Sequence, residues 1–140
     1  MGNEDKTSDQ LISELHQASP IVLIVEDDQI NIFLLETMLR KTNAEVWHVE
    51  NGQQAVECCQ NHPEVTLVLM DLKMPEMDGF EATRLIKAFR SDLVIIAVTA
   101  FAMPGDRERA LEAGCDDYMS KPFTSDQLKC KLNDYIRIYS

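Results

Sequence analysis

Short apolar runs alternate with longer segments of helical periodicity along most of this chain. The apolar runs cover residues 21–25, 45–49, 67–70, 93–98 and 116–119. The first, third and fourth runs are almost wholly apolar and rich in Val and Ile, which is typical of strands covered by helices on both faces of a sheet. The second and fifth runs are mixed in polarity and suit the two edges. This alternation predicts an α/β fold built around a parallel sheet.

Helical spacing is found between these runs, where apolar residues recur three and four positions apart. The residues with this spacing are Ile30, Phe33, Leu34 and Met38, then Phe80, Leu85, Ile86 and Phe89, and finally Leu128, Leu132, Ile136 and Tyr139. Thr124 and Gln127 have the spacing of a capping box and predict where the last helix starts. Five strands and five helices are therefore expected.

Residues 1–19 differ from the rest of the chain because they are polar and carry only one weak amphipathic patch. A helix of that length is marginal on its own. We interpret residues 1–19 as a leader or the remnant of a linker, and residues 20–140 as one domain. The length of 140 residues is close to the roughly 150 residues of a typical domain, and a hydrophobic content of 45% is enough for an ordinary core.

The charge balance is strongly acidic, since 13 Lys and Arg against 24 Asp and Glu leave a formal net charge of -11. Such a charge argues against the phosphate contacts on which nucleic-acid binding depends, and against contact with anionic membranes. No apolar run approaches the roughly 20 residues of a membrane span, and the first residues lack the basic and apolar regions of a secretory signal. We therefore expect a cytoplasmic domain without a direct nucleic-acid or membrane partner.

Cysteine and histidine residues show no metal-binding spacing. Cys58, Cys59, Cys115 and Cys130 form no CxxC pair, and the first two are sequence neighbours that would make a strained disulfide. Reduced thiols packed as small apolar side chains are the expected state. The three histidines lack the paired spacing of a zinc site, so zinc has little support.

Polar side chains with potential chemistry gather where the apolar runs end. Glu26 and Asp27 follow the first run, Asp71 the third, Thr99 the fourth and Lys121 the fifth. The carboxyl ends of parallel strands meet at one edge of a sheet, where loops bring side chains towards one another. Carboxylates brought together there are costly without a cation. Because the ligands are oxygens with no His or Cys nearby, they favour Mg²⁺ over zinc.

Each of these residues also has an ordinary structural explanation. Asp28 fits the N-cap of the helix that starts near residue 29, and Asp71 fits an Asx turn. Thr99 is a strand former in a strand, and a lone lysine such as Lys121 is most often a solvated surface residue. The combination is harder to dismiss, because acids, a hydroxyl and an ammonium group follow or end four separate strands.

This combination contains the groups needed to transfer a phosphoryl group to a carboxylate. An aspartate can attack phosphorus when a metal ion, a lysine and a hydroxyl neutralise the phosphoryl oxygens. The chain lacks the GxGxxG, GxxxxGKS/T and GxSxG sequences that would indicate a dinucleotide site, a nucleoside triphosphate site or a nucleophile elbow.

Four segments in a fixed order resemble the receiver domain of two-component response regulators. They are VLIVEDD at residues 22–28, LMDLKMPEMDG at 69–79, VTA at 98–100 and AGCDDYMSKP at 113–122. The resemblance covers residues 21 to about 138. It implies a flavodoxin-like (βα)5 three-layer sandwich, whose parallel five-stranded sheet has the order 2-1-3-4-5.

The resemblance also implies how a phosphoryl group is held. Asp71 matches the phosphoacceptor, and Thr99 and Lys121 match the residues that contact the phosphoryl oxygens. Tyr118 matches the switch aromatic that moves inward when the hydroxyl residue shifts towards the phosphate; an edge-strand aromatic packed on the last helix is the alternative interpretation. The peptide bond between Lys121 and Pro122 is expected to be cis, as it usually is in this family.

Mg²⁺ is the cofactor that the resemblance implies. Asp27 matches a direct ligand and Glu26 one that acts mainly through water, and Asp71 with the backbone carbonyl of Lys73 completes the coordination. Glu26 stands where Asp is commoner in the family, which lengthens one arm of the site. Lys73 and Phe101 occupy positions that influence the access of water to the acyl phosphate, and shielding by Phe101 predicts slow to moderate loss of phosphate.

The function expected from the resemblance is a switch controlled by phosphorylation. A histidine kinase or a histidine phosphotransfer protein would supply the phosphoryl group. The domain itself would assist this transfer and the slow hydrolysis of the product without being a turnover enzyme. Phosphorylation would shift the surface around residues 101–121 between two arrangements, and the alternative is a relay without a switch in this chain.

Two larger architectures fit this function. Residues 74–83 and 99–103 are most similar to receivers of hybrid sensor histidine kinases, whose parent protein can be anchored in a membrane, and a stand-alone response regulator is the alternative. A haloacid-dehalogenase-like phosphatase is a remote alternative, because Asp71 lacks the second acid of that family's nucleophile motif. The intact set of acids, hydroxyl and lysine argues against a pseudo-receiver that acts by contacts alone. A weak homodimer through the apolar switch face is left open.

Overall fold

The computed structural model describes residues 7–8, 19–100 and 102–139. The expected leader therefore lies almost wholly outside the described residues, and so does Phe101. Strands and helices alternate along the described chain. The strands are β1 (Ile21–Val25), β2 (Glu45–Val49), β3 (Leu67–Asp71), β4 (Val94–Thr99) and β5 (Asp117–Ser120), and the helices are α2 (Gln29–Leu39), α3 (Gly52–Asn61), α4 (Gly79–Phe89), α5 (Asp106–Ala113) and α6 (Ser125–Asn133).

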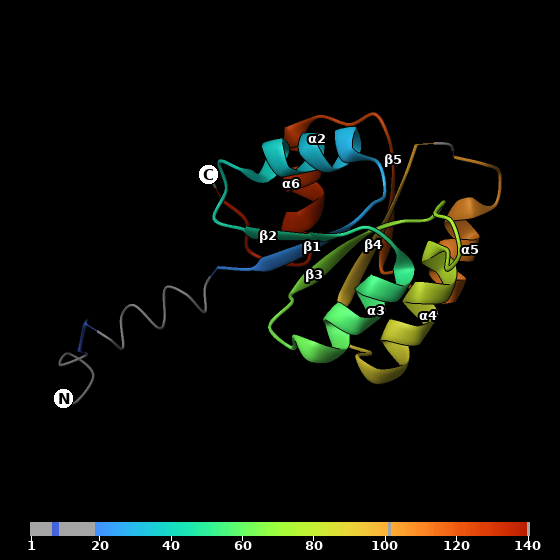
Figure 1. Ribbon diagram of the computed structural model, residues 1–140. Coiled ribbons are helices and arrows are strands. Elements are labelled where there is room, and N and C mark those ends of the chain that lie inside the picture. Colours follow the sequence, from blue (N-terminus) through green and yellow to red (C-terminus); the bar gives the residue numbers. More distant parts are fainter. Residues whose placement is uncertain (1–6, 9–18, 101, 140) are drawn as a thin grey trace.

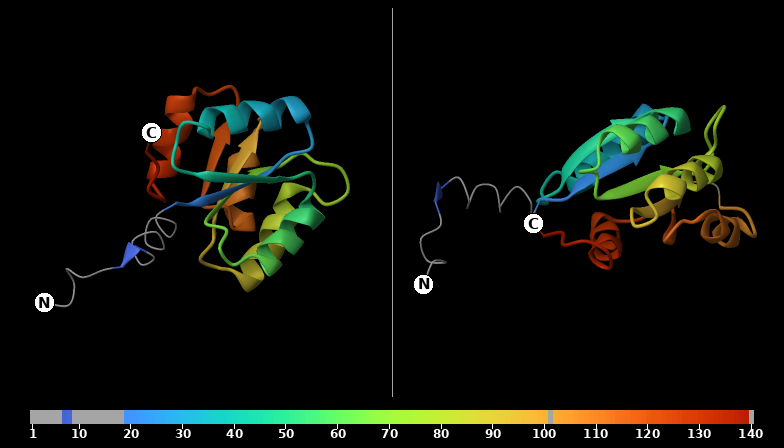
Figure 2. Two further views of the ribbon diagram at one scale, coloured as in Figure 1. Left: turned by 60° about the vertical axis from the view of Figure 1, so that its left-hand side comes forward. Right: turned by 90° about the horizontal axis from the view of Figure 1, so that it is seen from below.

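All five strands run parallel in one sheet of order β2-β1-β3-β4-β5. Helices α2 and α6 cover one face of the sheet, and α3, α4 and α5 cover the other (Figure 1, Figure 2). This confirms the predicted α/β class, the flavodoxin-like three layers and the strand order. The chain leaves β1 and β3 towards opposite faces, so the carboxyl ends of these two strands border the crevice where open α/β sheets bind ligands.

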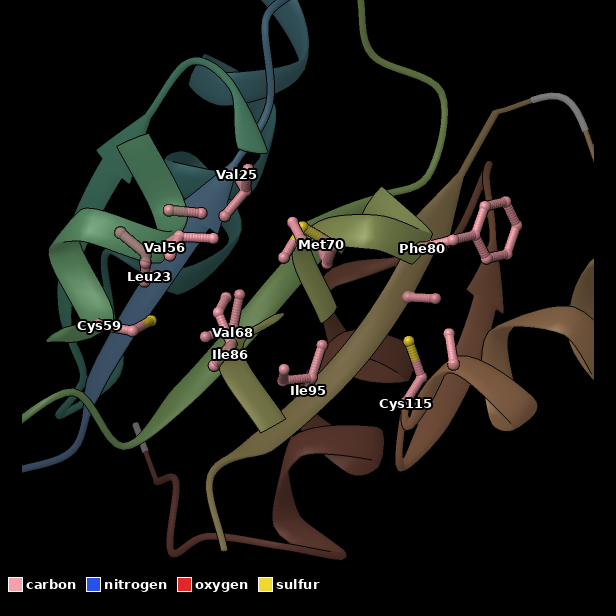
Figure 3. Close-up of a cluster of buried hydrophobic side chains, with 14 of the residues drawn as sticks. Leu23, Val25, Val56, Cys59, Val68, Met70, Phe80, Ile86, Ile95 and Cys115 are labelled. Carbon is pink, nitrogen blue, oxygen red and sulfur yellow. The ribbon is translucent and has the colours of Figure 1, made fainter. Parts of the chain in front are cut away.

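Two buried clusters, one on each face of the sheet, explain why the central strands are apolar throughout. Leu23 of β1 and Val68 of β3 belong to the cluster beneath α3, α4 and α5 (Figure 3). The preceding residues, Val22 and Leu67, belong to the cluster beneath α2 and α6. The edge strands β2 and β5 contain exposed and half-buried positions, as their mixed polarity predicts.

The last three strands end one residue later than the apolar runs indicate. β3 extends to Asp71, β4 to Thr99 and β5 to Ser120. Asp71 lies in register with Val98 on β4, and Thr99 with Ser120 on β5. Pairing with a neighbouring strand, which a hydrophobic pattern does not reveal, therefore holds two of the predicted site residues within the sheet.

Helix α2 forms as predicted, but its apolar spacing indicates the wrong buried face. Ile30, Phe33 and Leu34 are 70%, 58% and 48% exposed. The buried residues of this helix are Ile32, Leu35 and Leu39. Because α2 is apolar on nearly all sides, periodicity identifies a helix without deciding which side meets the sheet. Packing of α2 against α6 and β2 makes that choice.

The last helix begins at its predicted capping box and ends earlier than its apolar spacing indicates. α6 stops at Asn133, whose side chain accepts the backbone N–H of Ile138 at 2.8 Å. The backbone N–H of Tyr139 donates to the side chain of Asn43 at 2.9 Å. These bonds draw the chain towards the start of β2 and compete with further helical hydrogen bonds. Ile136 still packs on the core, whereas Tyr139 is 53% exposed.

One peptide bond and the cysteine side chains have the states that the sequence predicts. The peptide bond between Lys121 and Pro122 is cis, as predicted. All four cysteines are free, and burial raises the pKa of Cys59 to about 11 and also raises the pKa of Cys115, which keeps both thiols protonated. Among the described residues, no helix is long and apolar enough to cross a membrane.

Candidate functional site

Three carboxylates meet at the carboxyl edge of the sheet. Glu26 and Asp27 directly follow β1, and Asp71 ends β3, the strand beside it. One oxygen atom from each carboxylate lies within 4.8 Å of the other two. Asp71 is far from Glu26 and Asp27 in the chain, and the parallel pairing of β1 with β3 brings it beside them.

A cavity of about 170 Å³ opens beside these carboxylates. We call it the acidic cavity; it is lined by Glu26, Asp27, Asp28, Asn31, Asp71, Lys73, Thr99, Ala100 and Lys121. It therefore contains every residue that the sequence predicts for contact with metal or phosphoryl group. The sequence does not predict Asn31 or Ala100. Asn31 is a polar residue between two isoleucines in the first turn of α2, which is a signal that could have found it.

Lys121 forms an ion pair with one of the three acids. Its Nζ donates to Oε1 of Glu26 at 2.8 Å, and the two side chains are 17% and 3% exposed. A buried carboxylate needs such a partner to remain charged. The backbone N–H of Asp28 also donates to Glu26, at 3.3 Å from Oε2. The ammonium group that the resemblance assigns to phosphoryl oxygens is thus held beside the acidic cluster.

Asp71 has an unusual pKa for a carboxyl group. Its pKa is raised to about 7, chiefly by burial. The backbone N–H of Lys73, 3.1 Å from Oδ1, opposes this rise, and the neighbouring Glu26 adds to it. Without a cation, a large share of Asp71 is therefore protonated near neutral pH, and a cation in the cavity would favour the carboxylate.

Thr99 buries a hydroxyl group that has no hydrogen-bond partner. The residue is 0% exposed, and its Oγ1 is unpaired although it lines the acidic cavity. Leaving a buried hydroxyl unpaired costs about 1–3 kcal/mol. Its backbone is well anchored, because the N–H of Lys121 donates to the carbonyl of Thr99 at 2.8 Å. The hydroxyl is available to a ligand that enters the cavity.

Tyr118 lies outside the acidic cavity, in the middle of β5. Its half-buried side chain packs against the cluster beneath α3, α4 and α5. The alternative interpretation, packing on the last helix, is wrong, because α6 covers the opposite face of the sheet. Burial, with the charges of Asp106 and Glu108, raises the pKa of the Tyr118 hydroxyl, which places this ring near the start of α5.

The loop between β3 and α4 is pressed against the end of β3. A Cβ atom on Gly79 would lie 2.2 Å from the backbone oxygen of Asp71, a distance that no side chain tolerates. Asp78 caps α4 by accepting the backbone N–H of Glu81 at 2.9 Å. Glu76 has a φ of 66°, which is uncommon for a residue with a side chain. Because Gly79 has no side chain, α4 can start directly beside Asp71.

The donor groups in the acidic cavity fit a hard divalent cation. Carboxylate oxygens are the ligands that Mg²⁺ prefers, and a cation among them offsets their mutual repulsion. The ammonium group of Lys121 and the free hydroxyl of Thr99 line the same cavity and can donate to an anion bound beside such a cation. The arrangement therefore has places for both a metal ion and an anionic group at Asp71.

Comparison with protein families matches residues 22–133 to the response regulator receiver domain. Sensor protein GacS of Pseudomonas syringae pv. syringae is 42% identical over 119 residues, which are 81% of this chain and 13% of that protein. Polar-differentiation response regulator DivK of Brucella anthropi is 35% identical over 117 residues, which are 82% of this chain and 94% of that protein. The chain thus spans a small part of the first relative and nearly all of the second.

Solved structures of receiver domains share both fold and sequence with this chain. The receiver domain of sensor histidine kinase PA1611 from Pseudomonas aeruginosa PAO1, with a magnesium ion coordinated in its active site cleft, has a TM-score of 0.77 and 39% identity over 84% of this chain and 98% of that one. The complex of the histidine phosphotransfer protein Ypd1 with the receiver domain of Ssk1, from Saccharomyces cerevisiae, gives a TM-score of 0.76 and 32% identity over 84% of this chain and 89% of that one.

Proposed function

Because this chain belongs to the response regulator receiver domain family, we propose that Asp71 accepts a phosphoryl group from a phosphohistidine. The observation that supports this most directly is the single cavity that unites Asp71 with two further carboxylates, Lys121 and the unpaired hydroxyl of Thr99. Phosphoryl transfer to an aspartate requires a nucleophilic acid, donors for the phosphoryl oxygens and a cation.

Mg²⁺ is the cofactor that fits the acidic cavity. Glu26, Asp27 and Asp71, with the backbone carbonyl of Lys73, would hold it, and when bound it supplies positive charge beside the carboxylate and the incoming phosphoryl group. The similar receiver domain of PA1611 has a magnesium ion in its active site cleft. The carboxyl of Asp71 would then have a pKa below its value of about 7 in the metal-free protein and remain nucleophilic.

Asp71, Lys121 and Thr99 each have a separate role in the proposed phosphoryl transfer. An oxygen of Asp71 forms the new bond to phosphorus, the bond from phosphorus to the histidine nitrogen breaks, and the imidazole leaves. Lys121 exchanges its contact with Glu26, now 2.8 Å, for a phosphoryl oxygen. That exchange is favourable only when another cation balances the buried Glu26. Thr99 donates a hydrogen bond from its hydroxyl to a second phosphoryl oxygen and so gains the partner it lacks.

Thr99 and Tyr118 are the residues that would report phosphorylation to the surface. A pull on the hydroxyl of Thr99 moves the end of β4, to which the N–H of Lys121 is bonded at 2.8 Å. Tyr118 lies on the neighbouring strand in register with Ala97, two positions before Thr99. Its ring packs on the side of the sheet that carries α5 and can follow this movement. The result is a shift between two arrangements of one fold.

The partner that carries the phosphohistidine would dock on an apolar face of α2. We define this α2 docking face by the exposed side chains of Ile30, Phe33 and Leu34. Beside it lies a mainly apolar cavity of about 360 Å³, which shares Asn31, Ala100 and Lys121 with the acidic cavity. A protein seated there would bring its histidine to Asp71. In the similar yeast complex, a histidine phosphotransfer protein binds a receiver domain.

The parent protein is proposed to be a hybrid sensor histidine kinase. The chain covers 81% of its own length in the match to GacS but only 13% of that protein, as expected for one receiver within a larger kinase. DivK supports the stand-alone alternative, because the match covers 94% of that regulator. A kinase domain encoded in the same reading frame would establish the first architecture, and a complete reading frame of receiver length the second.

The proposed function is tested by intact mass after incubation with a small phosphodonor and Mg²⁺. The protein is expected to gain one phosphoryl group, and Asp71→Asn is expected to gain none, because the amide oxygen is a poor nucleophile. Removal of Mg²⁺ with a chelator is expected to abolish labelling as well. Asp126→Asn, which changes a carboxylate that is 93% exposed, serves as the control and should be labelled normally. Absence of labelling under donor excess, or labelling of Asp71→Asn, would contradict the proposal.

A further inference from the structure

A buried carboxylate outside the acidic cavity connects the loop after β3 with the segment before α5. Asp106 is the first residue of α5, and its side chain is 2% exposed. Its Oδ2 accepts the backbone N–H of Met103 at 2.9 Å and lies 3.4 Å from Nζ of Lys73. Arg109, one turn along the same helix, is 3.8 Å from Oδ1. One side chain thus contacts α5, the segment before it and the loop after β3.

Lys73, the distant partner of Asp106, also belongs to the proposed phosphoryl site. It follows Asp71 by two residues, its backbone N–H donates to Oδ1 of Asp71 at 3.1 Å, and it lines the acidic cavity. Its ammonium group is engaged by Asp106, although the side chain is 40% exposed and has room to move. Lys73 therefore touches the phosphoacceptor through its backbone and α5 through its side chain.

We propose that Asp106 is a positioning residue that holds the Lys73 ammonium group in a contact with which a phosphoryl group on Asp71 must compete. This inference rests on the proposed function of Asp71. A phosphoryl group adds roughly −1.5 to −2 charges two residues from Lys73 and attracts its ammonium group. When Lys73 leaves, Asp106 remains buried with less compensation, which is unfavourable. The segment that Asp106 anchors through Met103 then loosens.

Competition makes the two contacts of Lys73 thermodynamically linked, so weakening one must strengthen the other. Asp106→Asn is the sharpest variant, because its amide oxygen can still accept the N–H of Met103 while the charge that holds Lys73 is lost. A role limited to accepting the N–H of Met103 would survive this change. A role in positioning Lys73 would not.

The experiment measures the dissociation constant of beryllofluoride, a phosphoryl mimic, in saturating Mg²⁺ by NMR titration. Asp106→Asn is expected to bind about three- to tenfold more tightly than the wild type, because Lys73 no longer has to leave a carboxylate. In a Lys73→Gln background the same change is expected to have no effect on affinity. Equal or weaker binding by Asp106→Asn, or an equal gain without Lys73, would overturn the inference.

Asp116 provides a matched control for the loss of a carboxylate with the same kinds of partner. Its Oδ2 accepts the backbone N–H of Ile95 at 2.9 Å and Nζ of Lys87 at 2.9 Å, and none of these residues lines the acidic cavity. Asp116→Asn is expected to leave the beryllofluoride affinity unchanged. If the wild type neither binds beryllofluoride nor gains a phosphoryl group, the proposed function itself fails; a wild type that binds, with an unchanged Asp106→Asn, overturns only the inference.

A second measurement tests the inference even if Asp106→Asn does not fold. Lys73→Gln changes a partly exposed side chain and leaves Asp106 without its distant partner. Amide hydrogen exchange over residues 102–113 is expected to speed up in the wild type when beryllofluoride binds. In Lys73→Gln this exchange should already be fast before the mimic is added. Slow exchange in free Lys73→Gln, or no acceleration in the wild type, would overturn the inference.

Discussion

At the scale of single residues, the acidic cavity contains groups that destabilise the fold until a ligand compensates them. Asp71 has a raised pKa, and Thr99 buries a hydroxyl group without a partner. Glu26 is nearly fully buried and depends on one ion pair with Lys121. Burial of polar groups without full pairing costs free energy, so a cation and a phosphoryl group that pair them gain that free energy on binding.

The raised pKa of Asp71 predicts a pH-dependent gain in stability for Asp71→Asn. In the metal-free protein this carboxyl has a pKa of about 7, whereas in the unfolded chain it has an ordinary value near 4. Between about pH 4 and pH 7 the unfolded state binds fewer protons, so Asp71 makes the fold less stable as the pH rises. Asn does not titrate. The variant is expected to exceed the wild type by on the order of 2 kcal/mol at pH 8 and by little at pH 4.5.

Urea unfolding in a chelator at the two pH values checks this expectation. The exposed Asp126→Asn controls for the loss of a surface carboxylate. The pH-dependent loss of stability would not come from Asp71 if the difference between Asp71→Asn and the wild type stays constant with pH. The same trend in Asp126→Asn would also contradict that assignment.

Because the hydroxyl of Thr99 is unpaired, we expect Thr99→Val to raise the stability of the free protein and to weaken its binding of a phosphoryl group. Valine has nearly the same shape and no hydroxyl, so the free protein should gain about 1 kcal/mol of unfolding free energy. Affinity for beryllofluoride with Mg²⁺ should fall about tenfold or more, because one donor to the phosphoryl oxygens is lost. Chemical denaturation and titration measure the two effects.

Thr66 is the matched control for this substitution. Its Oγ1 accepts the backbone N–H of Ile21 at 3.1 Å, so Thr66→Val leaves that N–H without its partner and should destabilise the fold. Beryllofluoride affinity should not change in this variant. Loss of stability in Thr99→Val would show that its hydroxyl is paired in the free protein.

At the scale of elements, α2 has two apolar faces, one packed in the core and one proposed for docking. Leu35 and Leu39 pack in the core cluster with β1 and α6, while the α2 docking face remains exposed beside the acidic cavity. An exposed apolar surface of this kind marks an interaction site more often than an ordinary helix surface. The N-cap of this helix, Asp28, directly follows two of the metal-binding candidates, so the first turn of α2 lies beside the proposed phosphoryl site.

Because the docking face of α2 is separate from its buried face, Phe33→Ala is expected to impair phosphoryl transfer from a protein donor but not from a small phosphodonor. Phe33 is 58% exposed, so its truncation should change the unfolding free energy by less than about 1 kcal/mol. The rate of phosphotransfer from a phosphorylated histidine phosphotransfer protein should fall about tenfold or more. Labelling by a small phosphodonor should remain normal.

Leu111 on α5, which is 42% exposed, provides the control for loss of a surface apolar side chain. Leu111→Ala should leave both donors equally effective. An equal loss with both donors in Phe33→Ala would show damage to the acidic cavity rather than to docking.

At the scale of the whole molecule, the acidic residues that give the net charge of -11 fall into two groups. Three of the acids form the cluster at the carboxyl edge of the sheet, and the others include caps, ion pairs and exposed residues. Repulsion within the cluster acts between the ends of β1 and β3, two neighbouring strands in the interior of the sheet. A cation that joins these strand ends therefore stabilises the sheet as a whole.

This arrangement predicts that Mg²⁺ raises the melting temperature of the protein. A ligand at ten times its dissociation constant stabilises the folded state by about 1.4 kcal/mol, which is about 3 to 6 °C for a domain of this size. Asp27→Asn removes one proposed ligand and should greatly reduce the shift. Sodium chloride at equal ionic strength is the control for screening. Equal shifts with both salts would contradict a specific site.

The predictions made from sequence succeeded best where a structural property is local. The apolar runs, the capping box of α6 and the N-cap at Asp28 depend on residues close together in the chain. The polar residues that follow strands could be assigned to one sheet edge, because parallel strands necessarily end together. Their roles in binding Mg²⁺ and a phosphoryl group stay predictions that the experiments above test.

The sequence by itself determined that this protein is an α/β receiver domain whose acids, hydroxyl and lysine end successive strands, because that pattern is written in short segments. The tertiary structure alone decided which face of α2 is buried, that α6 ends at Asn133, and that Lys121 pairs with Glu26 and Lys73 with Asp106. The physical reason is that each of these outcomes depends on contacts between segments distant in the chain. Their free energies are set by packing and burial, which no local pattern contains.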